Sequence, residues 1–174
     1  MPEFVSTAIA LFFAWLFAVS AWHKLRHPGF YRELLRSWFV QKAGSVGIWP
    51  LAVLELVIVL SLLFPASRSG ALLLVAVLLL LYAAGMGWQL LRGRAYLKCG
   101  CAGPAAETTI SRALVWRNLI CAQLALFAAQ QITAGSLHFL NAGVAVLCAA
   151  FLCLLYLCCE QLISNAQHFA LEKR

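Results

Sequence analysis

Two cysteines separated by one glycine, Cys99-Gly100-Cys101, lie in a short polar segment between two long apolar runs. Neighbouring thiols do two kinds of chemistry: their thiolates exchange with disulfides, and they bind soft metal ions. The glycine allows the unusual backbone dihedral angles that a small Cys-x-Cys ring requires. A disulfide in such a ring is strained and easily reduced, which favours exchange over permanent cross-linking. The pattern therefore predicts a reactive dithiol formed by Cys99 and Cys101.

Positive charge gathers around this motif. Lys98 directly precedes Cys99, and Arg94 and Arg117 are expected close to it. Neighbouring cations lower the pKa of a thiol and so raise the fraction of reactive thiolate. We therefore expect Lys98 to support the reactivity of the dithiol, while Gly100 gives the turn its shape.

Five further cysteines lie in the apolar part of the chain. Cysteine behaves as a small apolar residue when it is buried, so Cys121, Cys148 and Cys153 are interpreted as packing residues. Cys158 and Cys159 end the last apolar run, on the same side as the Cys-Gly-Cys motif. We interpret this pair as a candidate second thiol station.

The composition predicts that the lipid bilayer is the main solvent of the chain. Of its 174 residues, 64% are hydrophobic and only 11% are charged, whereas soluble domains carry about a quarter charged residues. We expect a single all-α domain, residues 1–174, built as an integral membrane bundle of five transmembrane helices. Each predicted span is near the roughly 20 residues that cross the hydrocarbon, and the spans cover residues 4–22, 48–64, 70–91, 113–133 and 138–162.

A short amphipathic helix is predicted between the first two spans. Pro28 suits the first turn of a helix, and Phe30, Leu34 and Trp38 follow at a spacing of four residues with charged residues between them. This pattern is typical of a helix that lies in the membrane interface. We expect that helix to cover residues 28–39.

The formal net charge of +7 does not indicate a nucleic-acid partner, because the basic residues lie at the ends of apolar runs. Of the 13 lysines and arginines, all but Arg68 fall on the side of the Cys-Gly-Cys motif when five spans are assumed. The positive-inside rule then places the N-terminus outside and the motif at the cytoplasmic face.

Glu55 lies near the start of the second apolar run. An ionisable side chain within hydrocarbon costs about 2.5–3.5 kcal/mol or more unless it is paired. We therefore expect a partner for Glu55, with Lys24, Arg117 and Asn118 as the candidates. These residues are predicted to form a charged hollow beneath the Cys-Gly-Cys turn.

The order of these features resembles the MauE family, named for methylamine utilisation, which is distantly similar to DoxX-like membrane bundles. The resemblance is carried by Cys-Gly-Cys-Ala-Gly at residues 99–103 and Arg-Asn-Leu at residues 117–119, together with Lys24 and Glu55. Ala102 stands where the family usually has phenylalanine. The resemblance implies a multi-pass protein of the bacterial inner membrane.

What the resemblance further implies is a thiol–disulfide relay in protein maturation. The implied partners are a thioredoxin-like protein of the MauD type and a disulfide-containing client, the β-subunit of methylamine dehydrogenase. That client matures in the periplasm, whereas the charge pattern places the motif at the cytoplasmic face. A path for electrons through Cys153 and Cys148 is one hypothesis that would reconcile the two.

Three alternatives remain open from the sequence. The thiols could carry a soft metal such as copper or mercury, although methionine-rich or histidine-rich entry segments are lacking. A quinone-linked disulfide oxidase could use Trp88, Trp116 and Arg117 to line a ring pocket. A structural scaffold for the thioredoxin-like partner would need neither thiol. The relay itself requires no metal and no bound cofactor; a quinone belongs only to the oxidase.

Overall fold

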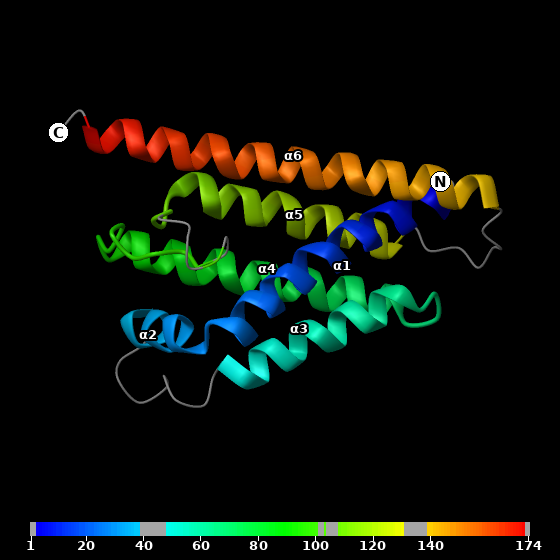
Figure 1. Ribbon diagram of the computed structural model, residues 1–174, viewed down its shortest axis with the longest axis horizontal. Helices are drawn as coiled ribbons and strands as arrows, with labels where there is room; N and C mark the ends of the chain where they lie inside the picture. Colours follow the sequence, from blue (N-terminus) through cyan, green and yellow to red (C-terminus); the bar gives the residue numbers. More distant parts are fainter. Residues whose placement is uncertain (1–2, 39–47, 101–102, 104–107, 131–138, 173–174) are drawn as a thin grey trace.

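The computed structural model describes residues 3–38, 48–100, 103, 108–130 and 139–172, and within these ranges the chain is helical apart from short connections (Figure 1). The helices are α1 (Glu3–Arg26), α2 (Pro28–Trp38), α3 (Ile48–Leu63), α4 (Arg68–Leu91), α5 (Arg112–Gln130) and α6 (Phe139–Glu172). The all-helical prediction is confirmed for the described part of the chain.

Four of these helices, α1, α4, α5 and α6, are long and apolar enough to cross a membrane. The fifth apolar helix, α3, has 16 residues, which corresponds to a length of about 24 Å. That length is below the roughly 30 Å of a bilayer's hydrocarbon core. The structure therefore supports a multi-pass membrane protein with four long helices and one shorter apolar helix.

The five apolar helices alternate in direction, so one end of the bundle collects the chain segments around the Cys-Gly-Cys motif (Figure 1). The C-terminal ends of α1, α4 and α6 and the N-terminal ends of α3 and α5 lie there. We call this the turn end of the bundle. Because of this alternation, Lys24 at the end of α1 and Cys99 after α4 lie at the same end of the bundle.

Helix α1 runs through the middle of the bundle and packs against α3 and α6, while α4 packs against α5. Large side chains such as Phe13 and Leu72 are fully buried between the helices. Helix α5 contributes Ala122, Ala125 and Ala129 to the same core, and small residues allow helices in a membrane to approach closely. The outer surfaces carry exposed leucines instead, as a lipid-facing surface requires.

Helix α6 is longer than the sequence analysis predicted. The fifth span was expected to end at Leu162, but the helix continues to Glu172 and has 34 residues, about 51 Å. No proline or glycine follows Leu162 to end it. The additional turns are also held from outside, because Gln167 hydrogen-bonds to Thr109 in the connection before α5.

Helix α2 forms where the amphipathic pattern predicted it, from Pro28 to Trp38. It packs against the turn end of the bundle rather than standing apart from it. Tyr31 is its buried residue, and the Trp38 carbonyl oxygen accepts a hydrogen bond of 2.8 Å from Gln89 Nε2 on α4. The apolar stripe of α2 thus faces the segment that carries the dithiol.

Candidate functional site

The segment that leads into the dithiol is extended and paired with a second segment. Lys98 and Thr109 form an antiparallel bridge. The Cys99 amide donates to the Thr108 carbonyl oxygen at 3.1 Å, and the Ile110 amide donates to the Leu97 carbonyl oxygen at 2.8 Å. These backbone bonds fix the position of Cys99 relative to the start of α5.

Gly100 could not be another residue without rearrangement. Its φ angle is +74°, in the left-handed region that side chains with a Cβ rarely adopt. A Cβ at this position would also lie 2.3 Å from Leu34 Cδ2 on α2. The glycine of the Cys-Gly-Cys motif therefore serves both the backbone turn and the close approach of α2.

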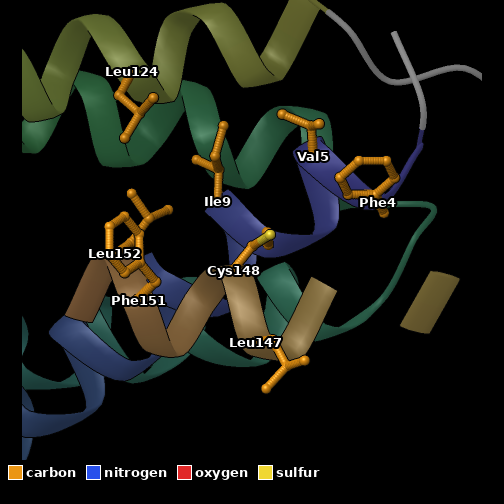
Figure 2. A pocket seen from close by; sticks show the side chains of 9 residues that line it. Phe4, Val5, Ile9, Leu124, Leu147, Cys148, Phe151 and Leu152 are labelled. Atoms are coloured by element: carbon orange, nitrogen blue, oxygen red, sulfur yellow. The ribbon is translucent and has the colours of Figure 1, made fainter. Parts of the chain in front are cut away.

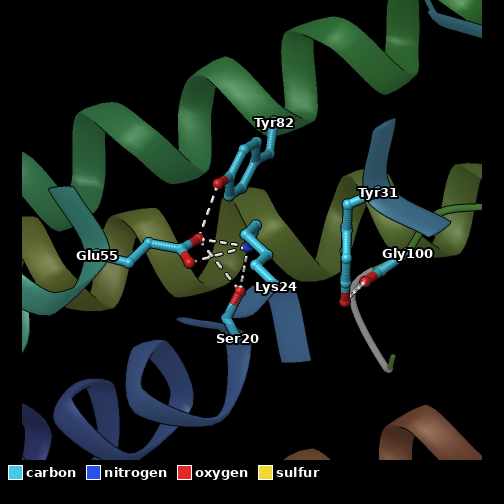
Figure 3. A network of polar contacts seen from close by, with 6 residues as sticks. All are labelled: Ser20, Lys24, Tyr31, Glu55, Tyr82 and Gly100. Carbon is cyan, nitrogen blue, oxygen red and sulfur yellow. Dashed lines mark hydrogen bonds and ion pairs between the residues drawn. The ribbon is translucent and has the colours of Figure 1, made fainter. Parts of the chain in front are cut away.

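Helix α2 also holds the turn by hydrogen bonds. The Tyr31 hydroxyl donates to the Gly100 carbonyl oxygen at 3.0 Å, as Figure 3 shows. Trp38 Nε1 donates to the Lys98 carbonyl oxygen at 3.3 Å. Two carbonyl groups on either side of Cys99 are thus bound by aromatic side chains of the amphipathic helix.

The Cys99 side chain points into the protein. It is 7% exposed and belongs to a small apolar cluster with Leu97, Ile110 and Leu114. Its sulfur lies 3.8 Å from the sulfur of Met86 on α4. Cys101, the second thiol of the motif, lies outside the described residues.

A buried ion pair lies at the end of α1 next to this turn (Figure 3). Lys24 Nζ is 2.7 Å and 2.9 Å from the two carboxylate oxygens of Glu55, and the Glu55 side chain is fully buried. Ser20 donates to the same carboxylate at 3.1 Å and Tyr82 donates at 3.0 Å. Of the three partners predicted for Glu55, the structure selects Lys24.

One aromatic side chain connects the ion pair with the turn. Lys24 Nζ lies 5.5 Å from the centre of the Tyr31 ring, within the range of a cation–π contact. The hydroxyl of the same ring binds the Gly100 carbonyl oxygen. Lys24, Glu55 and Gly100 are therefore brought together, as the sequence analysis expected.

Arg117 does not share this hollow in the way expected, because it pairs with Glu160 on α6. Its guanidinium also lies 4.9 Å from the centre of the Tyr156 ring. Both charged side chains are at least 90% buried. Asn118 is buried beside them, and within the described part of the chain its Nδ2 atom has no hydrogen-bond partner. In place of the single charged hollow that was predicted, the structure has two separate ion pairs. Lys24 and Glu55 join α1 to α3, and Arg117 and Glu160 join α5 to α6.

Helix α6 further braces the segment that pairs with Lys98. Gln167 Oε1 accepts from the Thr109 amide at 3.0 Å, and Gln167 Nε2 donates to the Thr109 carbonyl oxygen at 2.9 Å. One side-chain amide thus satisfies both backbone groups of Thr109. Because Thr109 faces Lys98 across the bridge, the end of α6 supports the base of the dithiol turn.

These residues can be compared with known proteins. A family model described as "Methylamine utilisation protein MauE" matches residues 2–155, which is nearly the whole chain. The chain belongs to the MauE family. The Methylamine utilization protein MauE of Paracoccus denitrificans is 33% identical over 153 residues, covering 86% of this chain and 82% of that protein. No solved structure matches the chain significantly.

The remaining thiols of this MauE-family chain are distributed along the bundle. Cys121 is buried, Cys153 is partly buried against the main core, and Cys158 and Cys159 are exposed on α6. Cys148 lines an open apolar groove of about 500 Å³ between the N-terminal turns of α1, Leu124 in the second half of α5, and residues 147–152 of α6, which Figure 2 shows. That groove lies towards the end of the bundle opposite the turn. Its lining residue Ile9 is about 22 Å along α1 from Lys24.

Among the described residues, no group of three or more His, Cys, Asp or Glu side chains could hold a metal ion. Lys98, a predicted supporting residue, is exposed beside Cys99. The site of this MauE-family protein is thus a turn with an inward-facing thiol, flanked by an exposed lysine and underlain by a buried ion pair.

Sequence reasoning missed several residues that hold this site. Tyr31 was read only as part of an amphipathic helix, and Glu160 and Gln167 were not singled out. Glu160 had a detectable signal, since it is an acid near the end of an apolar run and follows Cys158 and Cys159 directly. Both α6 residues lie beyond the segment that the MauE family model matches.

Proposed function

We propose that the chain is a membrane thiol–disulfide relay that supports the maturation of a disulfide-containing partner protein. The observation that carries the proposal is the position of Cys99. Its side chain is only 7% exposed, on a turn that a positive-φ glycine and the Tyr31 hydroxyl hold in place. A buried thiol next to a second cysteine suits the resolving role in a dithiol pair.

The proposed roles of the two thiols follow from this burial. The Cys101 thiolate attacks one sulfur of the partner's disulfide, forming a mixed disulfide and releasing the partner's other sulfur as a thiolate. The Cys99 thiolate then attacks Cys101, forming the Cys99–Cys101 disulfide and releasing the partner in its dithiol form. The dithiol of a thioredoxin-like protein reduces the ring again by the reverse steps, because thiol–disulfide exchange is reversible. Each cycle moves two electrons and uses no bound cofactor.

The surrounding charges support this chemistry in two ways. Exposed Lys98 provides positive charge next to the dithiol, which stabilises a thiolate. The buried Lys24–Glu55 pair instead holds the base of the turn, through the ring of Tyr31. Cys158 and Cys159, exposed on α6, form a second station that can pass electrons to or from the surface of the bundle.

We further propose five membrane spans, with α3 crossing as the shortest and α2 lying in the interface. Nine of the ten described lysines and arginines lie at the turn end, and Arg68 is the exception. This asymmetry favours an inner-membrane protein with its N-terminus outside and Cys101 at the cytoplasmic face. Impermeant thiol reagents should label Cys101 in inverted vesicles and not in intact cells; labelling of intact cells would reverse the orientation.

The client follows from the family. The Paracoccus relative is named for methylamine utilisation, and we extend that role to this chain. The proposed client is a disulfide-rich protein of that pathway, such as the β-subunit of methylamine dehydrogenase, and the proposed electron partner is thioredoxin-like, of the MauD type.

Trapping of mixed disulfides tests the relay. In a Cys99→Ala variant, a partner attacked by Cys101 cannot be released, so a thiol-sensitive adduct should accumulate after alkylation. A Cys101→Ala variant should give little adduct, because Cys99 is buried. Cys121→Ser removes a different buried thiol and should behave as the wild type. If neither Cys99→Ala nor Cys101→Ala yields an adduct under any redox condition, the relay is refuted.

One observation favours transfer of a soft metal ion as a second candidate function. The Cys99 and Met86 sulfurs are 3.8 Å apart, and thiolate and thioether are the ligands that Cu(I) prefers. A metal–sulfur bond of about 2.3 Å would let both sulfurs reach one ion. In a chelator competition, Met86→Leu and Cys99→Ser should both weaken binding of Cu(I). Equal affinity in wild type and Met86→Leu would eliminate this candidate.

A further inference from the structure

A groove opens beside the dithiol turn. It has a volume of about 350 Å³. One wall is formed by four side chains of α2, Phe30, Glu33, Leu34 and Ser37, and the other by residues 96–98. We propose that this groove is the docking site for an extended, acidic segment of the partner protein that carries the exchanging disulfide. The inference rests on the proposed relay and identifies the surface that its partner would use.

The groove lies directly beside the Cys-Gly-Cys turn. Lys98 lines the groove and directly precedes Cys99. Leu34 also lines it, and the same side chain is in close contact with Gly100. A chain segment lying in the groove therefore passes next to the Cys-Gly-Cys turn. Holding the partner's disulfide there supplies the proximity that sulfur exchange requires.

The lining of the groove combines apolar and polar side chains. Phe30 and Leu34 provide apolar surface, while Glu33 and Lys98 provide polar groups. Tyr96 stands at the groove with 72% of its surface exposed, and aromatic side chains are common anchors in protein interfaces. A mixed lining of this kind suits a peptide segment, which brings both a polar backbone and an apolar side chain.

The charge around the groove selects an acidic segment. Among the side chains whose exposure the structure describes, Glu33 is the one exposed acid. The exposed cations in the same set all lie at the turn end, and they are Arg26, Arg32, Arg36, Arg92, Arg94, Lys98 and Arg112. Such a field attracts an acidic partner and accelerates its encounter. The same field would slow the approach of a basic segment.

Two probe peptides and one small disulfide test this site. Each peptide carries one cysteine activated as a mixed disulfide with thionitrobenzoate, flanked by leucine and either aspartates or lysines. The small probe is the symmetrical disulfide of thionitrobenzoate itself. The protein is the full chain in neutral detergent with its five other cysteines replaced by alanine, so that the coloured thiolate reports only on Cys99 and Cys101.

Ser37→Trp is the variant that fills the groove, since Ser37 is exposed and lines it. Gly29→Trp is the matched control, because it lies on the same helix, outside the lining, where a Cβ would meet nothing within 4 Å. The wild type should react about tenfold faster with the acidic peptide than with the basic one at low salt, a difference that added salt reduces. Ser37→Trp should lose this advantage, while Gly29→Trp keeps it.

The small disulfide separates the two proposals. Its rate should be equal in the wild type, Ser37→Trp and Gly29→Trp, because it needs no docking surface. If Ser37→Trp reacts with the acidic peptide as fast as the wild type, the groove is not a docking site and is filled by lipid or solvent. If the wild type fails to react even with the small disulfide, the relay itself is refuted, and this inference with it.

Discussion

Lys24 Nζ and the Glu55 carboxylate form a buried ion pair, with distances of 2.7 Å and 2.9 Å between their atoms. The pair joins α1 to α3 at the turn end of the bundle, next to α2 and the dithiol turn. Each charge would be costly alone in this apolar bundle. The Glu55 carboxylate also accepts hydrogen bonds from the Ser20 and Tyr82 hydroxyls, and Lys24 Nζ donates to the Ser20 hydroxyl. The ion pair thus holds Lys24 against the ring of Tyr31, whose hydroxyl binds the Gly100 carbonyl oxygen.

Removing one partner of this pair should destabilise the bundle strongly. Lys24→Met leaves the Glu55 carboxylate buried without its cation, and such changes cost about 3–5 kcal/mol. The double variant Lys24→Met with Glu55→Leu should recover much of the loss, since no charge is then left unpaired. The free energy of unfolding in mixed detergent measures both. Equal stability of Lys24→Met and wild type would show that the pair is not buried as described.

Tyr31→Phe should slow disulfide exchange while leaving the fold intact. It removes the hydroxyl that binds the Gly100 carbonyl oxygen, a loss of about 0.5–1.5 kcal/mol, and keeps the ring beside Lys24. Tyr82→Phe is the matched control, because it removes a hydrogen bond to Glu55 and leaves the bond between Tyr31 and Gly100 in place. We expect exchange with a small disulfide to fall several-fold only in Tyr31→Phe. Equal rates in both variants would argue against a positioning role for Tyr31.

Gly100→Ala should impair the turn more than the same change at Gly93. Both glycines have positive φ angles, +74° and +72°, so both substitutions carry the cost of about 1–2 kcal/mol for a left-handed residue. Only at Gly100 would the new Cβ meet Leu34, whereas Gly93 has open space around it. The rate of disulfide exchange should therefore drop in Gly100→Ala and stay near wild type in Gly93→Ala. Adding Leu34→Ala should restore part of the loss, and no recovery would mean that the close contact is not the cause.

Gln167→Ala should increase local opening of the segment around Thr109, which pairs with Lys98 before the dithiol. It removes the two hydrogen bonds that the side-chain amide makes with the Thr109 backbone. Amide hydrogen exchange in residues 97–110 should then become faster by about one order of magnitude, the equivalent of about 1.4 kcal/mol. Gln161→Ala, an exposed position on the same helix, should change nothing there. Unaltered exchange in Gln167→Ala would show that α6 does not brace this segment.

Much of the architecture could be predicted from the sequence because bilayers impose a simple rule on apolar runs. A helix forms in each of the five runs, although Phe64 lies beyond the end of α3 and residues 131–133 and 138 lie outside the described residues, and the amphipathic helix ends at Trp38, within one residue of the expected position. The end of α6 could not be foreseen from hydropathy, since half of residues 163–172 are polar and Gln167 within them is held by its contacts with Thr109. That Glu55 has a partner could be predicted because an ionised carboxylate in hydrocarbon is costly alone, and Lys24 was one of the three candidates.

The partner of Arg117 could not be predicted in the same way. Any cation at the turn end could in principle have reached Glu55, and the choice depends on the rotation of α5 relative to its neighbours. The structure turns Arg117 towards Glu160 and Tyr156 on α6. The role of Tyr31 was hidden for a related reason, because its bond to Gly100 joins residues 69 positions apart. Such contacts follow from packing rather than from any local pattern.

The most direct test of the relay is a redox titration of the dithiol in the membrane. The protein keeps Cys99 and Cys101, its five other cysteines are alanine, and alkylation followed by mass measurement counts free thiols in buffers of graded thiol–disulfide ratio. The account predicts a reversible two-electron transition between two labelled thiols and none, and its loss in either single cysteine variant. Two fully labelled thiols at every ratio would contradict it.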